Sequence, residues 1–180
     1  FLYLRESEDD NRRQGAARLM SELMSGKAAV GGPFTLTDPA GAARSLADFR
    51  GKIVLLYFGY AGCPDICPTD LSRIGAMLNS LGAEESFVQA LFVTLDPERD
   101  TPGVLREYAA AFHPRLIALR GGESETRRIA TSYKVFYEKV PRPDGGYFID
   151  HAAFTFLLDR EGRYVAFFPP GTHADRMAVM

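Results

Sequence analysis

Two cysteines spaced four residues apart are the residues of this chain best suited to carry chemistry. Cys63 and Cys67 are its only cysteines, and they lie in the sequence GYAGCPDICP that begins at Gly59. The thiolate form of cysteine is both a nucleophile and a ligand for soft metal ions. Two thiols at this spacing indicate either a redox pair or two ligands of one metal ion. The alternative to both is a pair of buried, inert thiols.

The elements around the cysteines favour a functional pair. The apolar run Ile53 to Phe58 predicts a strand covered on both faces, and the periodic apolar residues that follow predict a helix over 71–81. A cysteine near a helix N-terminus gains thiolate stability from the helix dipole and from unpaired N–H groups. If the turn continues as helix, Cys63 and Cys67 lie on one face. Both sulfurs can then reach one ion or each other.

Two thiolates rarely satisfy a transition metal, so the three histidines are candidates for a further ligand. Soft sulfur ligands favour Cu(I), and imidazole suits copper in either oxidation state. His113 is expected at the end of a helix, before a proline, and His173 in a loop near the end of the sequence. His151 is the best placed of the three, because it precedes the strand predicted at 154–158 and such a loop can face a neighbouring strand-to-helix corner.

A charged loop, Asp96 to Asp100, follows the strand predicted at 87–95. Acidic residues at a strand end commonly form turns and helix caps, and Thr101 followed by Pro102 predicts the start of a helix. The functional alternative is a docking patch for a partner, or a group that supports a metal site from behind its ligands. Both interpretations stay open from the sequence.

The composition predicts one packed domain. The chain has 180 residues, of which 46% are hydrophobic, and its net charge of −2 argues against a nucleic-acid binder. Strands alternate with helices before a closing hairpin, which predicts an α/β fold with a central mixed β-sheet flanked by helices. The expected strands are 34–37, 53–58, 87–95, 116–119, 154–158 and 164–168, and the expected helices are 71–81, 102–112 and 123–133.

Residues 1–28 are predicted to be a tether ahead of a domain spanning 29–180. The segment is polar and charged, with Leu19, Met20, Leu23 and Met24 at helical spacing. The apolar residues that precede Arg5 have two interpretations, a frayed terminus or the remnant of a membrane anchor.

Three motifs, in this order, make the chain resemble the Sco/SenC proteins. They are Cys63-Pro-Asp-Ile-Cys67-Pro, then Val93-Thr-Leu-Asp96-Pro-Glu-Arg-Asp100-Thr-Pro, then Asp150-His151-Ala-Ala-Phe-Thr-Phe-Leu-Leu-Asp159. The resemblance covers residues 30–170 and implies a thioredoxin-like fold with an N-terminal β-hairpin extension. It also implies that Cys63, Cys67 and His151 bind a copper ion, as Cu(I), Cu(II) or both.

The same resemblance implies a partner and a location. The expected partner is subunit II of cytochrome c oxidase, whose binuclear copper site the protein would help to build, and another copper chaperone is the expected donor. The expected location is the periplasmic face of a bacterial inner membrane, or the mitochondrial intermembrane space, with anchoring by an N-terminal helix. Residues 1–28 then become the tether of a membrane-anchored protein.

Three functions compete for the same residues. The first is a copper metallochaperone, which is not an enzyme. The second is a thiol–disulfide oxidoreductase, with Cys63 and Cys67 as catalytic residues that keep the partner's cysteines reduced. The third is a redox or copper sensor. The histidine favours copper handling, because disulfide exchange needs no third soft ligand. Two differences from ordinary thioredoxins also favour copper handling. Three residues separate the two cysteines, and the residue before Thr155 is Phe154 rather than a proline.

Overall fold

The computed structural model describes residues 14, 17–18, 20–21, 30–63 and 66–179, and the chain divides into two units after Val30. Nearly all of the predicted tether, residues 1–28, therefore lies outside the described residues, including Leu19, Leu23 and Met24. The described positions between 14 and 21 are helical. Of the helices that the structure describes, none is at once long enough and apolar enough to cross a membrane.

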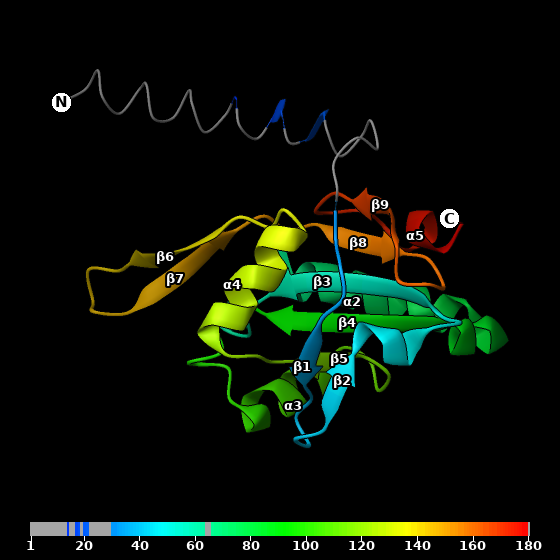
Figure 1. The fold of residues 1–180 in the computed structure, drawn as a ribbon, viewed down its shortest axis with the longest axis horizontal. Coiled ribbons are helices and arrows are strands. Elements are labelled where there is room, and N and C mark those ends of the chain that lie inside the picture. Colours follow the sequence, from blue (N-terminus) through cyan, green and yellow to red (C-terminus); the bar gives the residue numbers. More distant parts are fainter. Residues whose placement is uncertain (1–13, 15–16, 19, 22–29, 64–65, 180) are drawn as a thin grey trace. The chain divides into compact units, whose positions relative to one another are not determined.

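A mixed sheet of five strands, in the order β5-β4-β3-β8-β9, forms the centre of the larger unit (Figure 1). β3 and β5 run parallel to β4, whereas β8 runs antiparallel to both β3 and β9. β3 is almost wholly buried because apolar side chains cover both of its faces. The bounds are β3 Ile53–Gly59, β4 Val88–Thr94, β5 Ile117–Leu119, β8 Thr155–Leu158 and β9 Tyr164–Phe168.

Helices cover both faces of this sheet, as predicted, with α4 in front of it and α2 behind it in Figure 1. α2 packs with α3 and α5 against a core that includes Leu55 and Phe92, whereas Tyr133, directly after α4, packs its ring against Phe58 and Phe156 on the other face. The bounds are α2 Ile66–Ser80, α3 Pro102–Ala110, α4 Glu123–Ser132 and α5 Ala174–Ala178, with short 3-10 helices η1 Leu46–Phe49 and η2 Gly82–Phe87.

Local signals for helix ends agree with the predictions. Thr101 caps α3 by accepting a hydrogen bond from the Val104 N–H, and Pro102 is the first helical residue. Gly82, after the end of α2, has a φ of 57°, a conformation that glycine adopts without steric cost.

Two antiparallel hairpins lie outside the central sheet, and the sequence predicted one of them. β1 (Thr35–Thr37) pairs with β2 (Ala43–Ser45), which confirms the N-terminal hairpin extension. β6 (Tyr137–Pro141) pairs with β7 (Tyr147–His151), in a region where the sequence predicted no strand. The strands of this second hairpin escaped prediction because half of their side chains are exposed and their apolar pattern is weak.

The sheet topology brings three separate segments of the chain to one edge. Gly59 at the end of β3 lies opposite Thr94 at the end of β4, because these strands are parallel. β8 runs the other way, so its first residue, Thr155, lies opposite Tyr57 near the same end of β3. The cysteine loop, the loop 95–101 and the segment that contains His151 therefore meet at the carboxyl ends of the central strands.

Candidate metal centre

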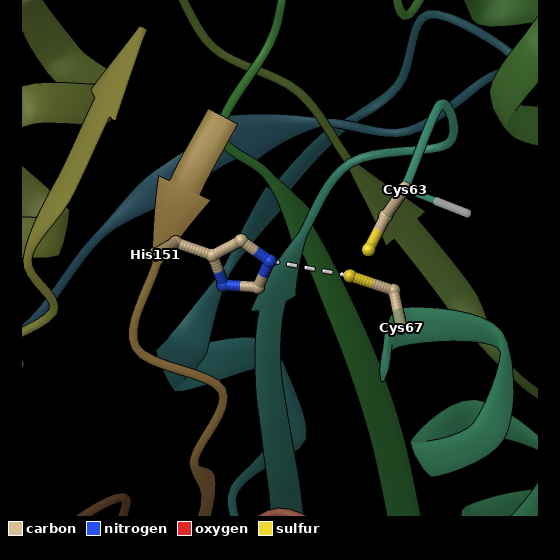
Figure 2. A group of neighbouring side chains, drawn as sticks. All are labelled: Cys63, Cys67 and His151. Carbon is tan, nitrogen blue, oxygen red and sulfur yellow. Dashed lines mark hydrogen bonds between the residues drawn. The ribbon is translucent and has the colours of Figure 1, made fainter. Parts of the chain in front are cut away.

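Cys63, Cys67 and His151 converge on one point. One ligand atom from each lies within 4.8 Å of the other two, and the His151 Nε2 atom is 3.3 Å from the Cys67 Sγ atom (Figure 2). Both cysteines are free thiols. The structure thus brings together the three residues that the sequence singled out, even though Cys67 and His151 are 84 residues apart.

The cysteine half of the site is built into the core at the β3–α2 corner. Cys67 is fully buried in the first turn of α2, whereas Cys63 is partly exposed in the preceding loop, where its N–H donates to the Tyr60 carbonyl at 3.2 Å. A Cβ atom at Gly59 would lie only 2.8 Å from the Cys67 sulfur. Glycine at the end of β3 therefore makes room for this sulfur. The sequence placed both cysteines on one helical face, but α2 begins only at Ile66, and residues 64–65 lie outside the described residues.

The surroundings of Cys67 act against the stabilised thiolate that the sequence led us to expect. The hydrogen bond with Cys63, followed by burial, raises the pKa of the Cys67 thiol, although the Tyr60 backbone N–H partly opposes this. Two thiols this close compete for one negative charge, and removal from water disfavours the charged form. The neighbouring thiol and desolvation therefore both oppose a thiolate at Cys67. A bound cation would reverse this balance.

The imidazole of His151 is oriented to present Nε2 to the sulfurs. Its Nδ1 atom lies 3.0 Å from the Ala152 carbonyl oxygen, which can only accept a hydrogen bond, so Nδ1 carries the proton. Nε2 is then left with a lone pair directed toward Cys67, which is the form of histidine that binds metals. The Tyr60 ring packs edge-on against the imidazole with a centroid distance of 5.8 Å. The sequence expected His151 in a loop, but it is the last residue of β7.

The charged loop Asp96–Asp100 supports the cysteine loop directly. Asp100 is buried, and its Oδ2 atom accepts hydrogen bonds from the Ala61 N–H at 2.9 Å and from the Thr94 hydroxyl at 2.6 Å. Asp96 is buried as well and accepts a hydrogen bond from the Tyr147 hydroxyl in the histidine hairpin. The interpretation of the loop as support for the site therefore agrees with these contacts.

A buried polar pair lies beneath the cysteines and was not predicted. The Tyr57 hydroxyl donates to Asp70 at 3.2 Å, and the Gly171 N–H donates to the same carboxyl at 3.0 Å. Burial raises the pKa of Asp70, against the lowering effect of these hydrogen bonds. No local pattern distinguishes Tyr57 from the other residues of β3, so the sequence contained no signal for this pair.

The other two histidines lie apart from this group. His113 is buried, not a helix-terminal surface residue; its Nε2 atom is 3.1 Å from Asn79 Oδ1, and its Nδ1 atom accepts from the Arg115 N–H. His173 directly precedes α5. Among the described residues, the one group of three or more cysteine, histidine or acidic side chains able to hold a metal ion is Cys63, Cys67 and His151.

Sequence comparison identifies the family. A family model described as SCO1/SenC matches residues 22–179. The chain belongs to the SCO1/SenC family. A relative in Rickettsia prowazekii, the SCO2-like protein RP587, is 42% identical over 144 residues, which are 79% of this chain and 70% of that protein. The mitochondrial SCO2 homolog of Bos taurus is 38% identical over 181 residues, 98% of this chain and 66% of that protein.

A solved structure of the family confirms the fold. Bradyrhizobium japonicum ScoI with copper bound is 42% identical and matches with a TM-score of 0.78, over 84% of this chain and 96% of that one. The thioredoxin-like α/β fold predicted from the sequence is therefore correct.

Proposed function

We propose that this chain is a copper metallochaperone that binds one copper ion through Cys63, Cys67 and His151. The observation that carries the proposal is the convergence of two sulfurs and one properly oriented imidazole nitrogen within 4.8 Å. Thiolate ligands select soft ions, among which Cu(I) is favoured, and imidazole is compatible with copper in both oxidation states. The free thiols support this function, because a disulfide cannot chelate.

The two cysteines differ in a way that suits binding followed by release. Cys67 is buried and Cys63 is partly exposed, so a partner would approach the site from the side of Cys63. Three protein ligands leave room for a thiolate of the partner to enter before the protein's own ligands leave. Such ligand exchange lets an ion that is bound tightly still be transferred.

Family membership and the copper-bound relative support the choice of ion and role. The Bradyrhizobium ScoI structure holds copper on the same fold at 42% identity. We propose that the acceptor is subunit II of cytochrome c oxidase, that this chain assists in assembling its binuclear copper site, and that another copper chaperone is the donor. Residues 1–28 would tether the domain 29–180 to the periplasmic face of a bacterial inner membrane, or would hold it in the mitochondrial intermembrane space. The SCO2 homolog of Bos taurus is a mitochondrial protein.

An anaerobic titration of the reduced protein with Cu(I), in competition with a coloured Cu(I) chelator, tests the ligand set. We expect one ion per chain and a fall in affinity of at least about a hundredfold for His151→Ala, because loss of one of three ligands should cost no less than changes to the groups behind the ligands. The matched control is His173→Ala, which removes an imidazole outside the site and should bind like wild type. Equal affinity of wild type and His151→Ala would contradict the proposal.

A thiol–disulfide oxidoreductase is the second candidate, and the unequal exposure of the cysteines favours it. The partly exposed Cys63 would attack a disulfide of the partner, and the buried Cys67 would then displace the partner's second thiol. The partner gains two electrons and two protons, while Cys63 and Cys67 become a disulfide that an external thiol must reduce again.

Trapping experiments separate the two candidates. The oxidoreductase predicts that Cys67→Ser accumulates a mixed disulfide with an oxidised subunit II fragment and that Cys63→Ser does not. It also predicts that His151→Ala keeps this activity, whereas the metallochaperone loses copper transfer in that variant. Equal behaviour of the two serine variants would exclude the division of roles between the cysteines.

A further inference from the structure

The hairpin that contains His151 is not part of the central sheet. β6 and β7 pair with each other, and within the described part of the chain neither pairs with a strand of the five-stranded sheet. Backbone hydrogen bonds of the sheet therefore do not fix where His151 lies relative to the cysteines. The short link from His151 to Thr155 of β8, together with side-chain contacts between the hairpin and its neighbours, must provide that position.

Tyr147, at the start of β7, makes the most extensive of these contacts. Its hydroxyl donates to Asp96 Oδ1 at 2.8 Å, and its carbonyl oxygen accepts a hydrogen bond from the Arg99 guanidinium at 2.7 Å. The guanidinium carbon also lies 3.6 Å from the centroid of the Tyr147 ring. The hydroxyl, the carbonyl and the ring of Tyr147 are thus all held by the loop that contains Asp96 and Arg99.

The partners of Tyr147 are themselves held firmly. Asp96 is fully buried and is paired with the Arg99 guanidinium through Nε. A planar guanidinium that donates to a carboxylate through one nitrogen and to a carbonyl through another fixes both groups in direction, which a lysine cannot do. The Asp96 N–H in turn donates to the Thr94 hydroxyl at the end of β4. These hydrogen bonds therefore connect Tyr147, through Asp96 and Thr94, to the end of strand β4 in the central sheet.

β7 transmits this position to the imidazole. Tyr147 and His151 are the two ends of one strand, about 13 Å apart at ~3.3 Å per residue, and alternation along a strand puts them on the same face. Arg99 is also linked to the imidazole through Tyr60, because its guanidinium carbon is 5.9 Å from the centroid of the Tyr60 ring, which packs against His151. The same five-residue loop holds the cysteine loop through Asp100 and Ala61.

We propose that Asp96, Arg99 and Tyr147 are positioning residues that hold the β6–β7 hairpin so that His151 reaches the two sulfurs. This inference rests on the proposed function for the claim that His151 is a copper ligand. The hydrogen bonds of the three residues described above go to one another, to the backbone and to the Thr94 hydroxyl. They set the distance between the imidazole and the thiols, and so the fraction of molecules in which all three ligands are in place.

The first test uses the metal-free, reduced protein and NMR signals of the histidine rings. Tyr147→Phe removes only the hydroxyl, and Arg99→Lys keeps the charge but loses the two-point contact. In both variants we expect the His151 ring signals to shift toward those of a free imidazole while the His113 signals stay unchanged. The matched control, Tyr164→Phe on β9, should leave both sets unchanged. Unaltered His151 signals in Tyr147→Phe and Arg99→Lys would overturn the proposal.

The second test is a double-mutant cycle on Cu(I) affinity. Tyr147→Phe is expected to weaken binding about tenfold in the wild-type background, which is the scale of one hydrogen bond to a charged group. In the His151→Ala background the same change should have no further effect, because no imidazole remains to be positioned. A tenfold loss in both backgrounds would mean that Tyr147 acts on the protein as a whole, which contradicts a positioning role.

The two tests distinguish failure of this proposal from failure of the proposed function. If His151→Ala binds copper as wild type does, the proposed ligand set is wrong, and the NMR experiment still decides whether the loop positions the hairpin. Thermal unfolding of each variant guards against general loss of structure, and Tyr147→Phe is preferred to changes of the buried Asp96 for that reason.

Discussion

The two halves of the candidate metal centre are held in place by different physical means. The cysteine half lies in the core, where Cys67 is fully buried between β3 and α2. The histidine half is the end of a separate hairpin, attached through a buried carboxylate, two arginines, buried side chains of its own strands and exposed ion pairs. Folding of the core therefore fixes the sulfurs, whereas a small set of contacts, most of them polar, fixes the imidazole. We infer that the imidazole is the ligand whose position is easiest to change.

Removal of a sulfur from the core half should have the largest effect on metal binding. In Cys67→Ser a hard hydroxyl replaces a soft ligand at a buried position. We expect Cu(I) affinity to fall by more than about a hundredfold, the upper range for changes that leave the ligands intact. Competition with a Cu(I) chelator measures this fall, and the urea midpoint shows whether the fold is retained. Equal loss from Cys67→Ser and Tyr147→Phe would remove the contrast between the two halves.

Crowding of the buried sulfur tests how rigid the core half is. In Gly59→Ala the new Cβ atom would lie 2.8 Å from Cys67 Sγ and 3.1 Å from ring carbons of Phe92 and Tyr57. We expect a loss of about 1–3 kcal/mol in the free energy of unfolding, as for other overpacked cores, measured by urea denaturation. Gly62→Ala is the control, because its Cβ would meet the Tyr60 ring at 3.6 Å, an ordinary contact. Similar losses in both variants would show that the crowding of Cys67 is not the cause.

The buried carboxyl beneath the cysteines predicts a pH dependence for the core half. Burial raises the pKa of Asp70 above 3.8, so the folded protein binds this proton more tightly than the unfolded chain does. The contribution of Asp70 to the free energy of unfolding is therefore complete below pH 3.8. It decreases as the pH rises from 3.8 through the raised pKa of the folded protein. Asp70→Asn should flatten this decrease in urea unfolding measured between pH 4 and 7. A steeper decrease of the unfolding free energy with pH in Asp70→Asn would contradict a raised pKa for Asp70.

The exposed ion pairs of the hairpin half should have the smallest effect. Lys139 Nζ lies 3.3 Å from Glu98 and 3.5 Å from Glu123, with all three side chains in contact with solvent. We expect Lys139→Ala to cost no more than about 0.5 kcal/mol of unfolding free energy, and this cost to vanish in high salt. Copper affinity should be unchanged. A loss above about 1 kcal/mol would show that these ion pairs, and not Tyr147 with its partners, hold the hairpin.

Much of the fold could be predicted from local patterns. The uniform apolar run of β3, the helical spacing after the cysteines, and Thr101 before Pro102 each record a preference of the chain within a few residues. The β6–β7 hairpin could not be predicted in the same way, because half of its strand residues are exposed and Pro141 lies at the end of β6. Its strands are fixed by pairing with each other and by contacts with a loop distant in sequence.

The sequence also identified the residues of the site but not their state. Cysteine spacing and family motifs were sufficient to single out Cys63, Cys67 and His151. The raised pKa of Cys67 was missed, because it depends on how deeply the thiol is buried and how close Cys63 comes. The contact of Asp96 with Tyr147, 51 residues later, was missed because neither position shows a local pattern that refers to the other.

The amino-acid sequence by itself determined which side chains are available for copper chemistry and which segments form the central strands and their helices, since both follow from residue type and short-range periodicity. Only the tertiary structure decided that two thiols and an imidazole meet at one edge of the sheet, and which buried groups hold them there. The physical reason is that strand order and direction bring distant segments together, and that desolvation is a property of the packed molecule.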